Sequence, residues 1–281
     1  MAALPTVKSK FDVTTKSYCV KFKQNPDHHT YFKSKDNFSD ACLPKHANNQ
    51  SIVELVESSF KLCVKLQIST IHKKYSRRLG SGWICGVNES GPDQYKIRIV
   101  TAKHVIGDDF KGIRISVQLY FHRFDQGDIE KTDRNVELFA SGQIESCGKD
   151  ICCFECCSDL GTFNKIKQDL EKHLKSLNTF IKYNQYTRDK NKVCFLLSHP
   201  HGCICYVSIG ERYIQNDDGS DDEDPNKEIM YTIASCQGSS GGYVLYLGLN
   251  NVKTKRIHLK SRSLFSISSK PILENMILKS D

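Results

Sequence analysis

A short glycine-rich stretch, "CQGSSGGYV" (236–244), carries side chains suited to nucleophilic chemistry. It lies between two apolar runs, "IMYTIAS" and "YVLYLGL". Glycine lets the backbone turn sharply, so the N–H groups of Gly238 and Ser240 can face one bound carbonyl oxygen while a serine hydroxyl attacks the carbonyl carbon. The same letters are also typical of a flexible turn between strands. Ser240 is therefore a candidate nucleophile that needs partners elsewhere in the chain.

A serine nucleophile needs a base and a group that orients the base. Among 10 histidines, His104 stands out because it follows an apolar strand directly, in "IRIVTAKHVIGDD". Asp150 heads another apolar strand, in "GKDICCFEC". Asp108 and Asp109 are rival acids, but they lie too near His104 in sequence to support it independently. Each residue taken alone is typical of an ordinary strand end. The joint pattern of His, Asp and Ser at three strand ends indicates a catalytic triad.

The elements that must position these residues are mainly strands. Short apolar, often β-branched segments alternate with turn residues, a rhythm typical of an all-β barrel or sandwich. A helix is predicted over 163–181 because its apolar residues form one stripe, and a second over 51–59 with Ser51 as its cap. A closing helix is predicted over 271–280. The predicted strands are 60–69, 81–87, 96–102, 113–121, 136–146, 150–156, 192–200, 203–214, 228–235, 242–249 and 256–267.

Composition narrows the class of protein. The net charge of +8 comes from scattered basic residues, so no specific nucleic-acid partner is expected. No apolar run reaches the roughly 18 residues of a membrane span, and no secretory leader is visible, so no membrane partner and a cytoplasmic or nuclear location are expected. The 13 cysteines are then expected to be reduced thiols. The acidic loop 216–228 lacks the ligand spacing of a calcium loop.

The motifs "TAKHV", "DICCFE" and "GSSGG" together resemble the active-site motifs of the trypsin/chymotrypsin-like serine proteases, the PA clan. Two further stretches resemble the high-temperature-requirement branch of that clan, "GSGWICG" (80–86) and "LLSHPHG" (196–202). The similarity covers about residues 58–268. It implies two six-stranded antiparallel β-barrels with the active site between them, and no PDZ-like domain follows the second block.

The resemblance implies a domain plan. Residues 1–50 form an N-terminal extension that is partly ordered at best, and 51–281 form the protease domain. The first barrel spans about 58–157, the connecting helix 163–181 and the second barrel 192–268, with the closing helix at 271–280. His104 would be the general base and then acid, Asp150 would hold the histidine tautomer, and Ser240 would form the acyl-enzyme. The N–H groups of Gly238 and Ser240 would form the oxyanion hole.

Departures from trypsin concern activation and specificity. Ser239 stands where trypsins carry the Asp that receives a new N-terminus, so trypsin-like activation is not expected. Ala234 replaces the Asp that selects Arg and Lys. His258, in "RIHLKS", resembles the histidine with which viral 3C-type proteases read glutamine, with Ile257 and Leu259 turned to the core. A pocket of Ala234, Ser235 and His258 would suit Gln, Glu or a medium apolar residue. The alternative is a histidine on a half-exposed strand.

No metal or organic cofactor is expected. The run "CCFECC" (152–157) contains ligand types for zinc, but on a strand Cys152 and Cys156 face one way while Cys153 and Cys157 face the other. The sequence thus predicts a serine endopeptidase that acts on protein or peptide substrates, with a regulatory partner or oligomer as its gate. The alternative is a catalytically silent scaffold that binds a peptide or protein in the same cleft. A basic nucleic-acid-binding protein is the remaining alternative.

Overall fold

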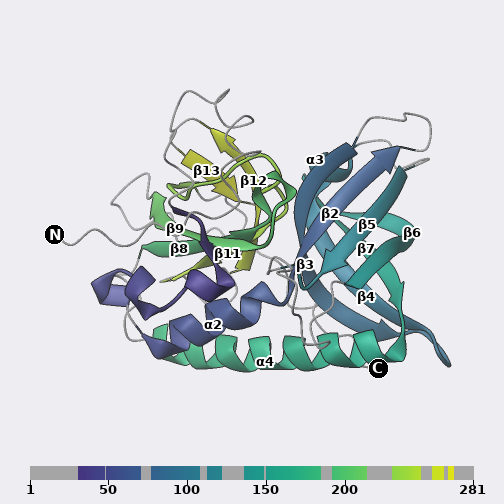
Figure 1. The fold of residues 1–281 in the computed structure, drawn as a ribbon, viewed down its shortest axis with the longest axis horizontal. Helices are drawn as coiled ribbons and strands as arrows, with labels where there is room; N and C mark the ends of the chain where they lie inside the picture. The colour runs from purple at the N-terminus through teal and green to yellow at the C-terminus, as the bar shows by residue number, and fades with distance from the viewer. Residues whose placement is uncertain are drawn as a thin grey trace, which may run out of the picture.

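A computed structural model describes residues 31–47, 49–70, 77–107, 113–121, 136–148, 150–184, 192–213, 230–247, 255–262 and 265–268. The predicted helix 271–280, the acidic loop 216–228 and the rival acids Asp108 and Asp109 lie outside these residues. The described chain is mostly β, as the alternation of short apolar segments predicted, and two sheets stand side by side above a long helix (Figure 1).

Six strands form the first barrel. They close in the order β2-β3-β4-β7-β6-β5, and every pair is antiparallel. Apolar residues alternate inward along them, as in β2, where Leu66 and Ile68 are buried and Lys65 and Gln67 are half-buried. The bounds are β2 Cys63–Thr70, β3 Arg77–Glu89, β4 Tyr95–Ala102, β5 Ile113–Leu119, β6 Val136–Gly148 and β7 Ile151–Ser158.

Six further strands are linked by antiparallel pairings that run round a ring, β8-β9-β10-β13-β12-β11 and back to β8. The short strand β1 adds to the edge of β9. The predicted second block of strands is therefore one sheet that returns on itself. The bounds are β1 Lys33–Ser34, β8 Val193–Ser198, β9 Tyr206–Tyr213, β10 Met230–Tyr231, β11 Tyr243–Tyr246, β12 Lys255–Arg262 and β13 Phe265–Ser268.

Two predicted strands in this block differ from the structure. The segment 256–267 contains two antiparallel strands, β12 and β13, which pair with each other, as Arg262 does with Phe265. In the described part of the segment 228–235, which begins at residue 230, the strand is the two-residue β10, after which the chain runs irregularly to the serine loop. Apolar composition alone does not distinguish a long strand from a hairpin, which explains both errors.

Helices cover the base of both sheets. α2 (Gln50–Phe60) packs against α4 (Leu160–Asn184), and α4 runs beneath the two sheets (Figure 1). The predicted stripe of α4 is inward, since Ile166, Leu170 and Leu177 are buried. α2 is capped by Asn49, whose side chain accepts from the Ser51 N–H, so the prediction of Ser51 as the cap was wrong by two residues.

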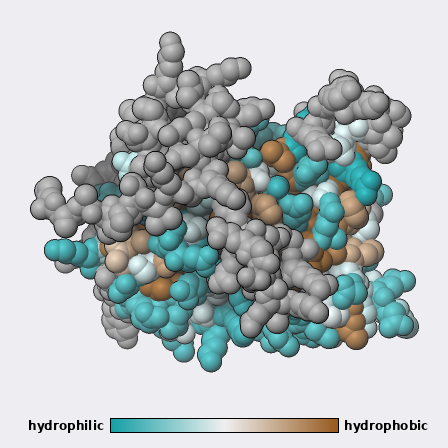
Figure 2. Space-filling model, viewed as in Figure 1, coloured by the Kyte–Doolittle hydropathy of each residue, from teal (hydrophilic) through white to brown (hydrophobic). Residues whose placement is uncertain are grey.

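The remaining helices are short. α3 (Lys103–Ile106) follows β4, and the 3₁₀ helices are η3 Lys35–Asn37, η4 Asp40–Cys42, η5 Lys45–Ala47 and η6 Pro200–Gly202. Hydrophilic side chains gather along the lower edge of the molecule, where α2 and α4 lie (Figure 2). Within the part of the chain that the structure describes, none of the helices has the length and apolar character that crossing a membrane requires.

Candidate active site

His104 and Asp150 are in direct contact. β4 ends at Ala102, and α3 begins at once, so His104 stands at the first turn after a buried strand. Asp150 lies in the turn before β7, which pairs with β4. One carboxylate oxygen lies 2.8 Å from His104 Nδ1, and the other accepts the His104 backbone N–H at 3.0 Å. The Asp150 carbonyl also accepts the Lys103 N–H, so three hydrogen bonds fix this corner.

The contact determines which nitrogen of His104 can act as a base. A carboxylate accepts hydrogen bonds, so Nδ1 carries the proton toward Asp150, and Nε2 keeps a lone pair. The His104 side chain is 44% exposed and the Asp150 side chain 29%. The imidazole is therefore both oriented and accessible, which are the two properties that a general base requires.

The glycine-rich loop is held against the first barrel by Ser81 of β3. The Ser81 N–H donates to the Ser240 carbonyl at 2.8 Å, and the Ser81 hydroxyl donates to the Gly238 carbonyl at 2.7 Å. The Ser81 carbonyl in turn accepts the Thr101 hydroxyl at 2.7 Å. Because Thr101 lies in β4, three residues before His104, these bonds place the Ser240 loop beside the strand that leads to the His104–Asp150 pair.

Two glycines in this loop are required by the backbone. Gly238 has φ +91° and Gly241 has φ +84°, values in the left-handed region that glycine favours. A Cβ on Gly241 would lie 2.0 Å from the Ser81 carbonyl oxygen, and one on Gly238 would lie 2.7 Å from the His199 carbonyl oxygen. The loop is thus a tightly packed turn, which excludes the alternative of a loose connection between strands.

The second serine of the loop is internal. Ser239 is fully buried, and its hydroxyl accepts the Ser198 hydroxyl at 3.1 Å and the Cys236 N–H at 3.2 Å. Its backbone N–H donates to the Cys236 carbonyl at 2.9 Å, which closes the turn. Ser240 is half-buried. Burial therefore separates the two hydroxyls, since Ser239 is used within the turn and Ser240 reaches partway to the surface.

His258 lies inside the second sheet. It is 1% exposed, so the alternative of a half-exposed strand position does not apply. The Tyr231 hydroxyl forms a hydrogen bond with His258 Nδ1. Burial, and to a smaller extent the charge of the nearby His104, lower the pKa of His258 to about 3. The His258 imidazole is therefore neutral near pH 7, and the tyrosine hydroxyl is its fixed partner.

The backbone of His258 also supports the serine loop. Its carbonyl accepts the Gly241 N–H at 2.7 Å, and its N–H donates to the Gly242 carbonyl at 2.8 Å. Of its two predicted neighbours, Ile257 is buried, and the side chain of Leu259 lies outside the described set. Ala234 and Ser235 are half-buried on the segment that leads into the loop. The three predicted pocket residues therefore flank the loop from β12 and from its own approach segment.

Three residues of this site were not among the sequence candidates. Ser81, Thr101 and Tyr231 hold the loop or the buried histidine, yet none carries chemistry of its own. Ser81 had a detectable signal, because it lies between two glycines in "GSGWICG". Gly82 packs closely against β2 and β4, since a Cβ added to it would lie 3.0 Å from both Val64 of β2 and Ile99 of β4.

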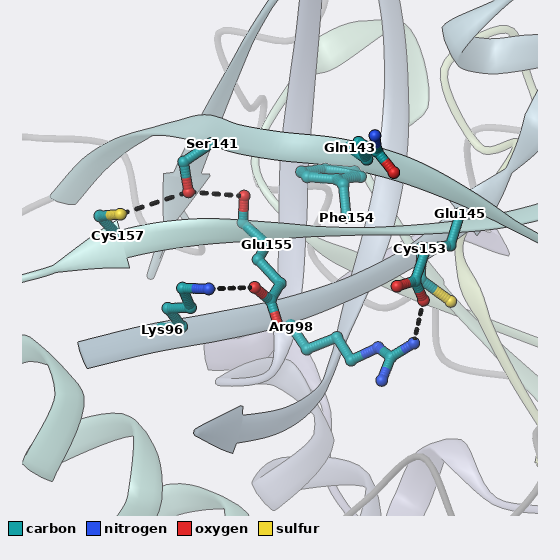
Figure 3. A pocket seen from close by; sticks show the side chains of 9 residues that line it. All are labelled: Lys96, Arg98, Ser141, Gln143, Glu145, Cys153, Phe154, Glu155 and Cys157. Atoms are coloured by element: carbon teal, nitrogen blue, oxygen red, sulfur yellow. Dashed lines mark hydrogen bonds and ion pairs between the residues drawn. The ribbon is translucent and has the colours of Figure 1, made fainter. Parts of the chain in front are cut away.

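The cysteine-rich strand β7 is separate from this site. A hollow on the outer face of β4, β6 and β7 is lined by Cys153, Glu155 and Cys157, which point to the same side (Figure 3). Cys152 and Cys156 are buried on the opposite side, as the strand alternation predicted. The structure pairs Cys147 with Cys153, so the expectation of reduced thiols throughout was wrong there.

Antiparallel strands explain that pairing, because β6 and β7 bring the Cα atoms of Cys147 and Cys153 to 6.5 Å, within the span of a disulfide. The buried cysteines Cys63, Cys85, Cys152, Cys156, Cys194 and Cys205 are free thiols. The charged side chains of the hollow pair with one another, Lys96 with Glu155 and Arg98 with Glu145. They therefore neutralise each other across the sheet surface.

Comparisons with known proteins give matches in structure only. No protein-family model matches the chain, and no curated protein matches it in sequence. The HtrA-type protease AlgW, solved with a tripeptide, has 16% identity and a TM-score of 0.43 over 79% of this chain and 60% of its own. The Rv3671c protease from M. tuberculosis, in its active form, has 13% identity and a TM-score of 0.42 over 79% and 82%.

A serine endoprotease from Yersinia pestis has 15% identity and a TM-score of 0.44, over 82% of this chain and 63% of its own. The chain therefore spans about three fifths of the length of AlgW and of the Yersinia enzyme.

Proposed function

We propose that this chain is a serine endopeptidase that hydrolyses peptide bonds through His104, Asp150 and Ser240. The observation that carries the proposal is that the Asp150 carboxylate accepts two hydrogen bonds from His104, one from the side chain and one from the backbone N–H. A strand-end histidine with a merely structural role has no need of a carboxylate that fixes both its tautomer and its orientation. The packed turn that carries Ser240 is hydrogen-bonded to Ser81 of β3, and Ser81 is hydrogen-bonded to Thr101 of β4, the strand that leads to His104.

In this proposal His104 Nε2 takes the proton of the Ser240 hydroxyl as Oγ attacks the scissile carbonyl carbon. The imidazolium that forms is stabilised by Asp150, which stays ionised. The carbonyl oxygen becomes an oxyanion, for which the N–H groups of Gly238 and Ser240 are the proposed donors. One such donor contributes about 2.7–4 kcal/mol to the transition state. His104 then protonates the leaving amine, and water releases the acyl group by the reverse sequence.

The proposal extends to the residue that precedes the scissile bond, P1. Ala234 supplies no charge for Arg or Lys, and His258 is neutral and buried beside Tyr231. A neutral imidazole can donate one hydrogen bond to the side-chain carbonyl of a polar residue. We therefore propose that P1 is Gln, Glu or a medium apolar residue, on a protein or peptide substrate.

A fluorophosphonate probe tests the catalytic proposal, because it forms a covalent bond only with an activated serine. We expect the full-length protein to be labelled, and peptide mapping to place the label on Ser240. Ser240→Ala should abolish labelling. The control is Ser90→Ala, an exposed serine in the turn between β3 and β4, which should label like the wild type.

A second variant separates an activated serine from a merely accessible one. Asp150→Asn keeps the size of the side chain but removes the charge that selects the His104 tautomer. We expect its labelling rate to fall by about 10⁴-fold. A folded wild-type protein that the probe never labels would instead support a catalytically silent peptide-binding scaffold. Equal labelling of the wild type and Asp150→Asn would exclude the triad.

A further inference from the structure

Three metal-binding side chains converge beside the serine loop, from segments that are far apart in the sequence. Cys63 begins β2, His199 follows β8, and Cys205 immediately precedes β9. The Sγ atoms and a ring nitrogen of this group all lie within 4.8 Å of one another. The three residues are 1%, 0% and 1% exposed. This Cys63–His199–Cys205 cluster is independent of the proposed triad.

The histidine of the cluster is oriented as a ligand. His199 Nδ1 lies 2.9 Å from the Cys203 carbonyl oxygen, which can only accept, so Nδ1 is the donor. The proton is then on Nδ1, and Nε2 presents a lone pair. Nε2 is buried and has no hydrogen-bond partner. An unsatisfied buried nitrogen is costly, and a cation bound by its lone pair removes that cost.

We propose that Cys63, His199 and Cys205 bind one zinc ion, with a solvent molecule as its fourth ligand. Two thiolates and one imidazole are a ligand set that zinc prefers over magnesium or calcium. Zinc binds sulfur at about 2.3 Å and nitrogen at about 2.0–2.1 Å, so tetrahedral ligand atoms are about 3.8 Å or less apart. The atoms of the cluster can reach that spacing with small side-chain adjustments.

Charge balance also favours zinc. Two thiolates compensate the double positive charge, so the loaded site is neutral and suited to a buried position.

The position of the cluster indicates a structural role. Cys63 belongs to the first barrel, and His199 and Cys205 belong to the second sheet, so the ion would join the two. The His199 N–H donates to the Ser81 hydroxyl at 2.8 Å, and the His199 carbonyl lies under Gly238. Zinc bound to Nε2 would therefore fix His199, whose carbonyl packs against Gly238 of the serine loop. All three ligands are buried, so no substrate reaches the ion directly.

Metal analysis of the full-length protein tests the proposal. Protein purified with a reductant and without chelators should contain about one zinc per chain, measured by native mass spectrometry and by elemental analysis. Cys63→Ala and Cys205→Ala should each reduce the content to near zero. The matched control is Cys85→Ala, a buried free cysteine in β3, which should keep its zinc.

A spectroscopic measurement on the wild type covers the case in which the variants do not fold. Replacing zinc by cobalt should give the visible bands of a tetrahedral site and the sulfur-to-cobalt charge-transfer bands of two thiolates. A chelator should lower the Tm, and zinc but not magnesium should restore it. The proposal is overturned if the wild type takes up no zinc, if Cys63→Ala retains it, or if mapping finds a Cys63–Cys205 disulfide in the reduced preparation.

Discussion

His258 illustrates how burial changes what a side chain can do. On an exposed strand its pKa would be near 6.5, and its charge would vary across the physiological range. Inside the second sheet, burial and the charge of His104 lower that pKa to about 3, so it stays neutral from pH 5 to 8. Tyr231 occupies Nδ1. Burial also raises the pKa of Tyr231 well above its usual value, so the hydroxyl stays protonated.

The residue-scale prediction concerns P1. In a peptide library varied only at P1, we expect Gln, Glu or medium apolar residues to be cleaved faster than Arg or Lys at pH 6 and at pH 8. Gln should exceed Glu, because a neutral imidazole does not compensate a carboxylate. Tyr231→Phe should lower the preference for Gln by up to about tenfold, the value of one hydrogen bond, while probe labelling persists. Dominant cleavage after Arg or Lys would refute this specificity.

At the scale of elements, the serine loop depends on β3 as well as on its own glycines. Ser81 contributes its N–H, its hydroxyl and its carbonyl to Ser240, Gly238 and Thr101. The loop also bonds to β12 through both backbone groups of His258. A turn held from two sheets keeps its shape without a disulfide.

The element-scale prediction is that Gly241→Ala damages this junction. The residue would have to keep φ near +84° with its Cβ 2.0 Å from the Ser81 carbonyl oxygen, so the loop must move. We expect a loss of at least about 2 kcal/mol in the free energy of unfolding, measured with urea, and loss of probe labelling.

The control for that variant is Gly161→Ala in the first turn of α4. Its φ is not in the left-handed region, and its nearest contact would be 3.1 Å from Asp159 Oδ1. Alanine favours the helix by about 1 kcal/mol, so stability should be unchanged or higher. If Gly241→Ala matched this control in stability and labelling, the proposed packing of the loop would be wrong.

At the scale of the whole molecule, α4 ties the two sheets together. Trp83 of β3 stacks on Tyr243 of β11 with ring centroids 3.8 Å apart, and His173 of α4 meets both rings edge-on. One turn earlier on the helix, Asp169 is buried. It accepts the Lys61 ammonium at 2.8 Å and the Tyr120 hydroxyl at 3.1 Å. The helix is therefore bonded to α2 and to the end of β5.

The whole-molecule prediction is that Asp169→Ala destabilises the protein by about 2 kcal/mol. Removing one partner of a buried ion pair costs about 3–5 kcal/mol, and the partial exposure of Lys61 reduces the loss. Glu171→Ala, an exposed acid on the same helix, should change the free energy of unfolding by less than about 0.5 kcal/mol. Equal urea midpoints for the two variants would show that Asp169 does not anchor the helix.

The sequence by itself determined the features that depend on neighbouring residues. The alternation of apolar segments predicted the strands of both blocks, and the stripe along 163–181 predicted α4 (Leu160–Asn184). His104 and Asp150 were candidates because each lies at the end of an apolar segment, and the structure shows that the two strands concerned, β4 and β7, pair along their length. Local patterns were less informative where two strands pair back on each other, as β12 and β13 do, or where a cap lies two residues earlier, as at Asn49.

Only the tertiary structure decided the contacts between distant segments. Ser81 meets Gly238 across 157 positions, Tyr231 meets His258 inside the second sheet, and Cys63 meets His199 and Cys205 across the two sheets. None of these pairs shares a helix face or a strand, so no periodicity links them. The cysteine-rich run 152–157 contains ligand types for zinc, but strand alternation divides it between two faces. Packing between distant segments, which side-chain periodicity does not encode, brought Cys63, His199 and Cys205 together.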